Sequence, residues 1–399
     1  MAKEEKKAPK LRFNGYTNDW EHVKPKKYLK ISKVPGSNGL IAKKLTVKLW
    51  GKGVVEKDTT FNGSENTKYF TRKSGQLIYG KLDFLHAAFG IVPQNLNNYE
   101  STADSPAFDI NDVGDRIFLI NYFLRPEFYL KNGEKANGSR KAKRIHEETF
   151  LNMPMQAPIK SEQEKIAKTL NSLNNTIQLH ERKCEELTLI KKALLQKLFP
   201  KKDVIKPEVR YKNFNDAWEQ RRFKDISKLS QGLQIAISKR FTYPGDGKLF
   251  YITNEFLNPN STVKYYIDSP TKNVIAEKTD ILMTRTGNTG KVVTDVEGVY
   301  HNNFFKISYN SSKIDRWFLY YLLNSYPIQR EILVRAGNST IPDLNHNDFY
   351  GIKIYIPTIE EQIKIGTFLT KVDSLIALHQ YKLKKLKQLK KFLLQNMFI

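Results

Sequence analysis

A short polar loop in the second half of the chain carries residue types that contact nucleic acids. Residues 284–291, Thr-Arg-Thr-Gly-Asn-Thr-Gly-Lys, directly follow the apolar run 281–283, which is typical of a buried strand. Arginine can donate two hydrogen bonds to guanine, asparagine can pair with adenine, and threonine hydroxyls and backbone amides can hold phosphates. The candidate contact residues of this polar loop are Arg285, Thr286, Asn288 and Lys291.

Two further loops lie at matching positions in the two halves of the chain. Residues 138–144 and 337–340 both begin with glycine, at an offset of 199 residues, and the first places four cations within five residues. In the first half, Tyr79-Gly80-Lys81 occupies the place comparable to the start of the polar loop, but a longer apolar stretch follows to Gly90. An ordinary solvated turn is the alternative interpretation at each position. The predicted DNA-facing residues are Lys81, Arg140, Lys141, Lys143, Arg144, Asn338, Ser339 and Thr340.

The sequence predicts neither catalysis nor metal binding by this chain. Residues 287–292 imitate a phosphate-binding loop, but their spacing is short and no Ser or Thr follows Lys291. Pro342-Asp343 could imitate a nuclease motif, but no Glu-x-Lys follows at a suitable distance. A glycine-rich nucleotide fingerprint and the Asn/Asp-Pro-Pro-aromatic motif of adenine methylation are both absent from the sequence. The lone Cys184 excludes an intramolecular disulfide and a Cys-built zinc site.

The formal net charge of +25 is distributed over the whole chain rather than concentrated in a tail. Such a surface favours binding to a polyanion such as DNA, because binding releases condensed counterions. A merely basic soluble protein is the alternative. The N-terminal stretch MAKEEKKAPK has no apolar core, and no apolar run is long enough to cross a bilayer. We therefore expect a cytoplasmic protein without a membrane partner.

The segments that must position these loops occur as an internal sequence repeat. Residues 158–199 return as residues 357–398 without a gap, at an offset of 199. The repeat extends more faintly to an Arg-aromatic…Trp-Glu pattern, which opens the two halves at 12–21 and 210–219. Between these matching segments the similarity nearly vanishes. The pattern indicates a shared scaffold that carries two different variable segments.

Both copies of the strong repeat predict a long helix with a heptad seam. A helix of about 38 residues would be roughly 57 Å long and would need a partner for its apolar stripe. Antiparallel pairing of the two copies would place the globular halves at opposite ends of a spacer, and intermolecular pairing is the alternative. His180 and His379 interrupt the seam at equivalent positions, where a polar residue that sets the register is favoured over a metal ligand. The predicted seam residues are Ile166, Leu170, Leu173, Ile177, Leu187 and Leu194 in the first copy, and Ile365, Leu369, Val372, Ile376, Leu386 and Leu393 in the second.

The two halves outside these helices contain short β-prone runs broken by Gly, Asn and Pro, with one helix expected in each, at 115–124 and 315–325. The predicted fold is α+β, with two globular, mainly-β domains separated by two long antiparallel coiled-coil helices in an internal pseudo-twofold repeat. The predicted domains are 1–157 and 206–356, and the predicted spacer helices are 158–205 and 357–399.

In this order of variable domain, helix, variable domain and helix, the chain resembles the specificity subunit (HsdS) of type I restriction-modification systems. The resemblance depends on the Pro-x3-Glu-Gln-x-Lys-Ile openings at 158–166 and 357–365 together with the Arg-aromatic…Trp-Glu openings. It implies a non-catalytic reader of double-stranded DNA. Each globular half would be a target recognition domain for one part of a split, asymmetric site, and the helices would set the distance between the two parts. Gly366, which stands where the first copy has Ala167, is a mild departure.

The resemblance also implies partners and cofactors. Two methyltransferase (M) subunits would bind through the helices and two restriction (R) subunits would join them. S-adenosylmethionine, ATP and Mg would belong to those partner subunits, with no cofactor bound by this chain, and the methylated base would be an adenine flipped from the duplex. The alternative is a non-specific nucleic-acid-binding protein that dimerises through its coiled coil.

Overall fold

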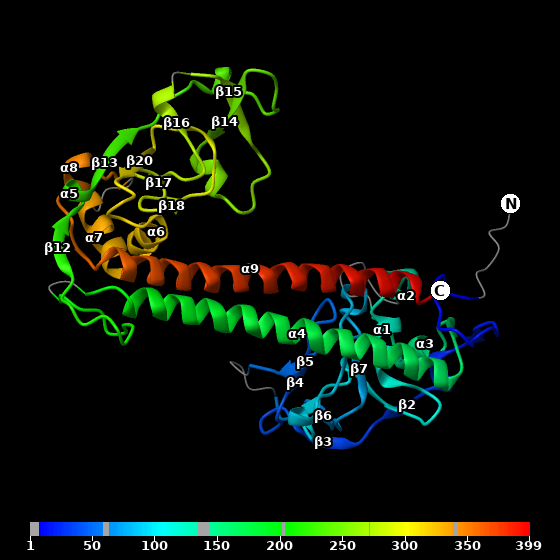
Figure 1. Cartoon of the computed structure of the whole chain (residues 1–399). Helices are drawn as coiled ribbons and strands as arrows, with labels where there is room; N and C mark the ends of the chain where they lie inside the picture. The colour runs from blue at the N-terminus through cyan, green and yellow to red at the C-terminus, as the bar shows by residue number, and fades with distance from the viewer. Residues whose placement is uncertain (1–7, 59–63, 135–143, 202–203, 271, 338–341) are drawn as a thin grey trace. The chain divides into compact units, whose positions relative to one another are not determined.

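The computed structural model describes residues 8–58, 64–134, 144–201, 204–270, 272–337 and 342–399. Its contacts divide the chain into two compact units (Figure 1). Unit 1 comprises Met1–His180 and Tyr381–Ile399, and unit 2 comprises Glu181–Gln380. Each unit therefore contains one β-rich half and a part of both long helices. The units cut across the four predicted segments, whose limits stay a prediction.

Unit 1 contains a sheet with the strand order β2–β10–β7–β8, a smaller sheet β3–β6–β9, and the pairs β4–β5 and β1–β11. Its strands are β1 (Glu21–Val23), β2 (Leu29–Ser32), β3 (Pro35–Asn38), β4 (Leu45–Val47), β5 (Val54–Glu56), β6 (Lys68–Thr71), β7 (Leu77–Tyr79), β8 (Phe89–Ile91), β9 (Glu100–Ser101), β10 (Ala107–Ile110) and β11 (Met155–Ala157). Its helices are α1 (Arg116–Phe123), α2 (Pro126–Gly133) and α3 (Glu147–Leu151), with 3-10 turns η1 (Pro25–Lys27), η2 (Phe84–His86) and η3 (Gln94–Leu96).

Unit 2 contains the sheets β13–β20–β17–β18 and β15–β14–β19–β16 and the pair β12–β21. Its strands are β12 (Glu219–Arg222), β13 (Ser227–Gln231), β14 (Lys248–Ile252), β15 (Tyr265–Asp268), β16 (Ile275–Ala276), β17 (Ile281–Thr284), β18 (Val292–Val293), β19 (Gly298–Tyr300), β20 (Phe304–Tyr309) and β21 (Lys353–Ile356). Its helices are α5 (Phe223–Ile226), α6 (Arg316–Asn324), α7 (Tyr326–Ala336) and α8 (His346–Tyr350), with 3-10 turns η4 (Ile237–Lys239), η5 (Asn254–Leu257) and η6 (Lys272–Val274).

The sheets β2–β10–β7–β8 and β13–β20–β17–β18 have the same antiparallel connectivity. The helix that follows each sheet also begins in the same way, because the carboxylate of Asp115 caps α1 and that of Asp315 caps α6. These helices confirm the predictions at 115–124 and 315–325. The two halves are thus two copies of one α+β unit, as the repeat predicts.

The structure has further helices in each half that the sequence does not predict: α2 and α3 in unit 1, and α5, α7 and α8 in unit 2. The prediction of one helix per half is therefore wrong. Pro126 stands in the first turn of α2 and Pro327 in the first turn of α7, where proline costs no hydrogen bond. A proline directly after a preceding helix is the local signal that could have revealed both.

The two long helices are α4 (Lys160–Lys197) and α9 (Ile359–Asn396). Within the described ranges, no helix combines the length and the apolar character needed to span a membrane. The predicted seam residues near the start of each helix are buried: Ile166, Leu170, Leu173, Ile177, Ile365, Leu369 and Val372. The others, Leu187, Leu194, Ile376, Leu386 and Leu393, are half-buried. Burial is therefore greatest where each helix starts, against the β-rich half that precedes it.

A buried glutamate near the start of each long helix binds an arginine from the beginning of the same half. Arg12 donates from Nε and Nη2 to the two carboxylate oxygens of Glu162 at 2.7 and 2.8 Å. Arg210 makes the same bidentate contact with Glu361, at 2.8 Å for both bonds. Both glutamates are fully buried, and the hydrogen bond raises the pKa of each arginine. The repeated Arg and Glu positions are therefore partners.

The glutamine that follows each of these glutamates joins the helix start to the neighbouring short helix. Gln163 accepts a hydrogen bond from the backbone N–H of Asp115 at 3.0 Å and donates to the carbonyl of Pro158 at 2.9 Å. Gln362 repeats both bonds with Asp315 and Pro357, each at 3.0 Å. We call the Arg, Asp, Glu and Gln of each unit the helix clamp. It supplies a physical reason for the repeated Pro-x3-Glu-Gln motif.

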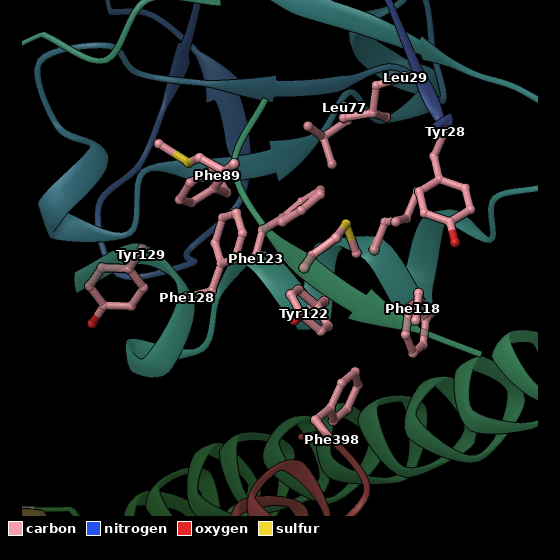
Figure 2. Packing of buried hydrophobic residues seen from close by; sticks show 14 of the residues in the cluster. Tyr28, Leu29, Leu77, Phe89, Phe118, Tyr122, Phe123, Phe128, Tyr129 and Phe398 are labelled. Atoms are coloured by element: carbon pink, nitrogen blue, oxygen red, sulfur yellow. The ribbon is translucent and has the colours of Figure 1, made fainter. Parts of the chain in front are cut away.

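Each unit also holds the end of the other long helix. In unit 1 the backbone N–H of Leu11 donates to the carbonyl of Asn396 in α9 at 2.8 Å. Figure 2 shows Phe398 facing Phe118 and Tyr122, with ring centroids 5.3 and 6.1 Å away. The end of α9 thus completes the aromatic core of unit 1.

Unit 2 uses equivalent residues for the end of α4. The N–H of Val209 donates to the carbonyl of Lys197 at 3.0 Å, and the ring of Phe199 lies 5.7 Å from that of Phe318. The core of unit 2 therefore contains residues from the start of α9 and from the end of α4. Residues from α4 and α9 of the same chain therefore lie in the core of each unit.

The helix clamp yields a test of stability. Arg12→Met leaves the carboxylate of Glu162 buried without its partner, so we expect the free energy of unfolding of unit 1 to fall by about 3–5 kcal/mol. Urea denaturation of the full chain, with hydrogen exchange to report unit 1 separately, measures the change. Lys10→Met, at an exposed position beside the clamp, should leave stability unchanged.

The double variant Arg12→Met/Glu162→Met removes both charges and should recover much of the loss. Additive destabilisation by the two substitutions would contradict a coupled ion pair at this position.

Candidate nucleic-acid interface

The polar loop 284–291 is a closed turn built on the hydroxyl of Thr284. This side chain is fully buried; its Oγ1 donates to the carbonyl of Asn288 at 2.5 Å and accepts from the N–H of Lys291 at 2.9 Å. Gly287 and Gly290 adopt φ angles of 73° and 87°, in the left-handed region that favours glycine. The turn leaves the side chains of Asn288 and Lys291 exposed. The loop can therefore present an amide and an ammonium group to a ligand from a fixed backbone.

Arg285 and Thr286 join the polar loop to the segment before α8. The guanidinium of Arg285 pairs with the carboxylate of Asp343 at 2.6 Å and lies 5.7 Å from the ring of Phe305. Thr286 forms an isolated backbone bridge with the same Asp343, and the hydroxyl of Thr289 donates to the carbonyl of Pro342 at 2.8 Å. Pro342-Asp343, which imitates a nuclease motif in the sequence, thus braces this loop.

A polar hollow of about 420 Å³ opens beside Arg285 in unit 2. The ring of His346 packs against that of Phe305, with centroids 4.7 Å apart and planes tilted by 57°, so two aromatic rings form one side of the hollow. The hollow is lined by Gln231, Arg285, Phe305, Asn345, His346, Asn347 and Asp348. Amide, guanidinium and imidazole groups around an aromatic wall suit the edge of a nucleic-acid base. Sequence inspection missed Gln231, Phe305 and His346, because no local pattern brings these distant segments together.

Lys81 occupies in unit 1 the position that Arg285 occupies in unit 2. The carbonyl of Lys81 accepts a hydrogen bond from Ile145, and the carbonyl of Arg285 accepts one from Leu344, 199 residues later than Ile145. The backbone hydrogen bonds therefore confirm that Lys81 and Arg285 occupy comparable places in the two halves, as the sequence predicts.

The side chain of Lys81 has a different environment from that of Arg285. It is 7% exposed, and its ammonium pairs with Glu147 at 2.9 Å. Burial alone would raise the pKa of Glu147, but the hydrogen bond and the charge of Lys81 outweigh it and hold that pKa below its ordinary value. Lys81 therefore has a structural partner inside unit 1, and its contact with DNA stays a prediction.

The remaining predicted contact residues are placed only in part. Arg144 is exposed and its guanidinium lies 3.4 Å from the carboxylate of Asp104. Arg140, Lys141, Lys143, Asn338, Ser339 and Thr340 lie outside the described residues. Within the described ranges, no three His, Cys, Asp or Glu side chains gather closely enough to hold a metal ion.

Comparison with known proteins matches this architecture along both halves. The family model for "Type I restriction modification DNA specificity domain" matches residues 93–189 and 215–388. The type I restriction enzyme MjaVIII specificity subunit of Methanocaldococcus jannaschii is 25% identical over 303 residues, which cover 70% of this chain and 69% of that protein. The putative type I restriction enzyme MjaX specificity subunit of the same organism is 26% identical over 284 residues, 69% of this chain and 64% of that protein.

Solved structures show a similar fold. The type I restriction-modification system S subunit from M. genitalium aligns over 98% of this chain and 99% of its own, with a TM-score of 0.54 and 15% identity. A chain from a study of assembly and conformational transition of a type I R-M system aligns over 95% of this chain and 97% of its own, with a TM-score of 0.52 and 16% identity. The fold is thus shared although most residues differ.

The Lys81–Glu147 pair predicts a pH-dependent stability. Because the folded-state pKa of Glu147 lies below its ordinary value of 4.5, its stabilisation is present above that value and is lost as the pH falls through the folded pKa. We expect Lys81→Met to destabilise unit 1 at pH 7, with a deficit that shrinks at acid pH. Unfolding of both proteins across this range measures it, with Lys26→Met, at an exposed position, as the control. A deficit independent of pH would contradict the assignment.

Proposed function

The chain belongs to the family of type I restriction modification DNA specificity domains, and from this premise we propose how its parts divide the reading of a DNA site. Its function is DNA sequence specificity in a type I restriction-modification system. Each β-rich half reads one part of a split, asymmetric site. The observation that supports this division is that both halves repeat the helix clamp, whereas the equivalent loop positions outside it, Lys81 and Arg285, have different side chains with different partners.

In unit 2 the proposed reading surface combines the polar loop with the hollow beside Arg285. Arg285 and Asn288 are suited to base edges and Lys291 to a phosphate. The hydrogen bond that Arg285 donates to the carboxylate of Asp343 holds the guanidinium in one orientation, which favours a specific contact over a loose electrostatic one. The family match over both halves does not favour the alternative of a non-specific nucleic-acid-binding protein.

The long helices are proposed to hold the two reading halves at a set distance and to bind the partner subunits. A helix of 38 residues spans roughly 57 Å. The helix α9 also exposes a second apolar stripe, outside the predicted seam, whose successive members are 3, 7 or 11 positions apart and so lie on one face of the helix. Its members are Phe368, Leu375, Leu378, Leu389 and Phe392. Apolar side chains in such a pattern suit a protein partner rather than water.

We further propose that this chain is a non-catalytic subunit. Two methyltransferase subunits would bind to the helices and two restriction subunits would join them, in the cytoplasm. S-adenosylmethionine, ATP and Mg would be bound by those partners, and the modified base would be an adenine flipped out of the duplex. Methylation or cleavage by the purified chain alone would contradict this assignment.

Exchange of one half tests the division of labour. Replacing residues 206–356 by the corresponding segment of another family member should change one half of the recognised site and leave the other half unchanged. The measurement is a map of methylated adenines in cells that express the hybrid with its partner subunits. The matched control replaces residues 1–157 instead and should change the other half. A hybrid that alters both half-sites would contradict independent reading.

Lengthening the helices tests the spacer. Seven residues inserted into both α4 and α9, after His180 and after Gln380, preserve the heptad and add about 10 Å. Because base pairs are stacked about 3.4 Å apart, the half-sites should move about three base pairs further apart in the methylation map. The same insertion in α4 alone would mismatch the two helices and should abolish assembly. Unchanged spacing with full activity in the doubly extended protein would rule out the spacer.

A further inference from the structure

Unit 1 exposes a tryptophan that the sequence does not mark. Trp50 is 58% exposed at the tip of the β4–β5 hairpin, whereas Trp20 and Trp218 are each 2% exposed. Large aromatic side chains left in water are uncommon and often mark binding surfaces. Lys48 and Lys52, on either side of Trp50, are also exposed. The hairpin tip therefore presents an indole between two cations.

The backbone at this tip is strained and braced. Trp50 has a φ angle of 59°, in the left-handed region that a bulky side chain rarely adopts. Its N–H donates to the carbonyl of His86 at 2.7 Å, and the N–H of Gly51 donates to the carbonyl of Ala87 at 2.9 Å. Ala87 is itself in the left-handed region, with a φ angle of 49°. The strained turns at Trp50 and at Ala87 are thus hydrogen-bonded to one another. Such strain persists where the surroundings or the function require it.

Packing leaves little room for the hairpin tip to move. A Cβ at Gly51 would lie 2.9 Å from a methyl group of Leu124, and a Cβ at Gly90 would lie 2.6 Å from one of Val54. The ring of His86 meets the indole of Trp50 edge to face, with centroids 5.5 Å apart. The indole is therefore exposed in a defined orientation.

Trp50 lies beside the connection of unit 1 that is equivalent to the polar loop of unit 2. Trp50 is braced by the β7–β8 connection, and the equivalent β17–β18 connection in unit 2 is the polar loop. Sequence comparison finds no match for residues 82–90 in the second half. Residues 82–90 of unit 1 thus support Trp50, which comes from the β4–β5 hairpin. At the equivalent place in unit 2, the polar loop exposes its own side chains, Asn288 and Lys291.

We propose that Trp50 is the base-stacking residue of unit 1, which places its indole against a base of one half-site while Lys48 and Lys52 contact the flanking phosphates. This inference depends on the proposed function, because it assumes that unit 1 reads a half-site. Both faces of a base are already stacked in a duplex, so this contact requires an opened base step or a base turned out of the helix. Stacking of the freed base on an aromatic side chain then contributes enough affinity to be measured.

The decisive variant is Trp50→Gly, because glycine accepts the left-handed backbone and loses only the side chain. Its melting temperature should equal or exceed that of the wild type, a result that a purely structural role would not give. Affinity of the complex reconstituted with its methyltransferase subunits for a duplex bearing the mapped site should fall about 10- to 100-fold. Trp50→Phe should retain most of the affinity. Leu130→Ala, which truncates another exposed apolar residue of unit 1, should have no effect.

Two further duplexes, each with one half-site scrambled, locate the effect. With the half-site of unit 1 scrambled, Trp50→Gly and the wild type should bind equally; with the other half-site scrambled, the difference should remain. Equal binding of the intact site by both proteins would overturn the inference, as would a uniform loss on every duplex or a loss of assembly with the methyltransferase subunits. If the wild type itself shows no preference for the intact site, the proposed function fails instead.

Discussion

The buried carboxylate at the start of each long helix is the constraint on which the rest of each unit depends. Glu162 and Glu361 are fully buried, and a carboxylate in such a place is tolerated only with a cationic partner. Arg12 and Arg210 supply that partner from the first residues of each half, which holds those residues across the helix start. Leu11 and Val209, next to these arginines, bind the end of the other long helix. One ion pair in each unit thus fixes where two helices meet one globular half.

A frame fixed in this way leaves the loops free to differ. The carbonyls of Lys81 and Arg285 occupy equivalent places, yet one side chain is buried against Glu147 and the other is bound to Asp343 beside an open hollow. The β17–β18 connection of unit 2 exposes polar side chains, whereas the equivalent β7–β8 connection of unit 1 binds the backbone of Trp50. These residues lie outside the helix clamp, so we expect the contacts of the clamp to survive their replacement. One frame can therefore carry different loops.

The parts of the fold that sequence inspection predicted are those with a local cause. The heptad period predicts α4 and α9, and the helices expected at 115–124 and 315–325 correspond to α1 and α6. Sequence inspection alone does not predict α2 and α7, because Pro126 and Pro327 can each interrupt a helix or begin one. The burial of Lys81 was missed for a different reason, since its partner Glu147 lies in another segment of the chain. Nothing in the order of residues singles out Trp50, whose exposure and strain result from contacts with His86 and Ala87.

By itself the sequence determined that the chain contains two copies of one α+β unit with two long helices, and it predicts that the DNA-reading residues lie where the copies differ. Hydrophobic period, capping and repetition relate residues that are near in sequence or at a constant offset, so they can be recognised in the sequence alone. Only the tertiary structure decided which residues work together. Arg12 meets Glu162 across 150 residues, and Arg285 meets Asp343 across 58. The first pair forms because the fully buried Glu162 requires a cationic partner, and the second because the backbone bridge between Thr286 and Asp343 brings its charges together. Both arrangements exist only once the chain has folded.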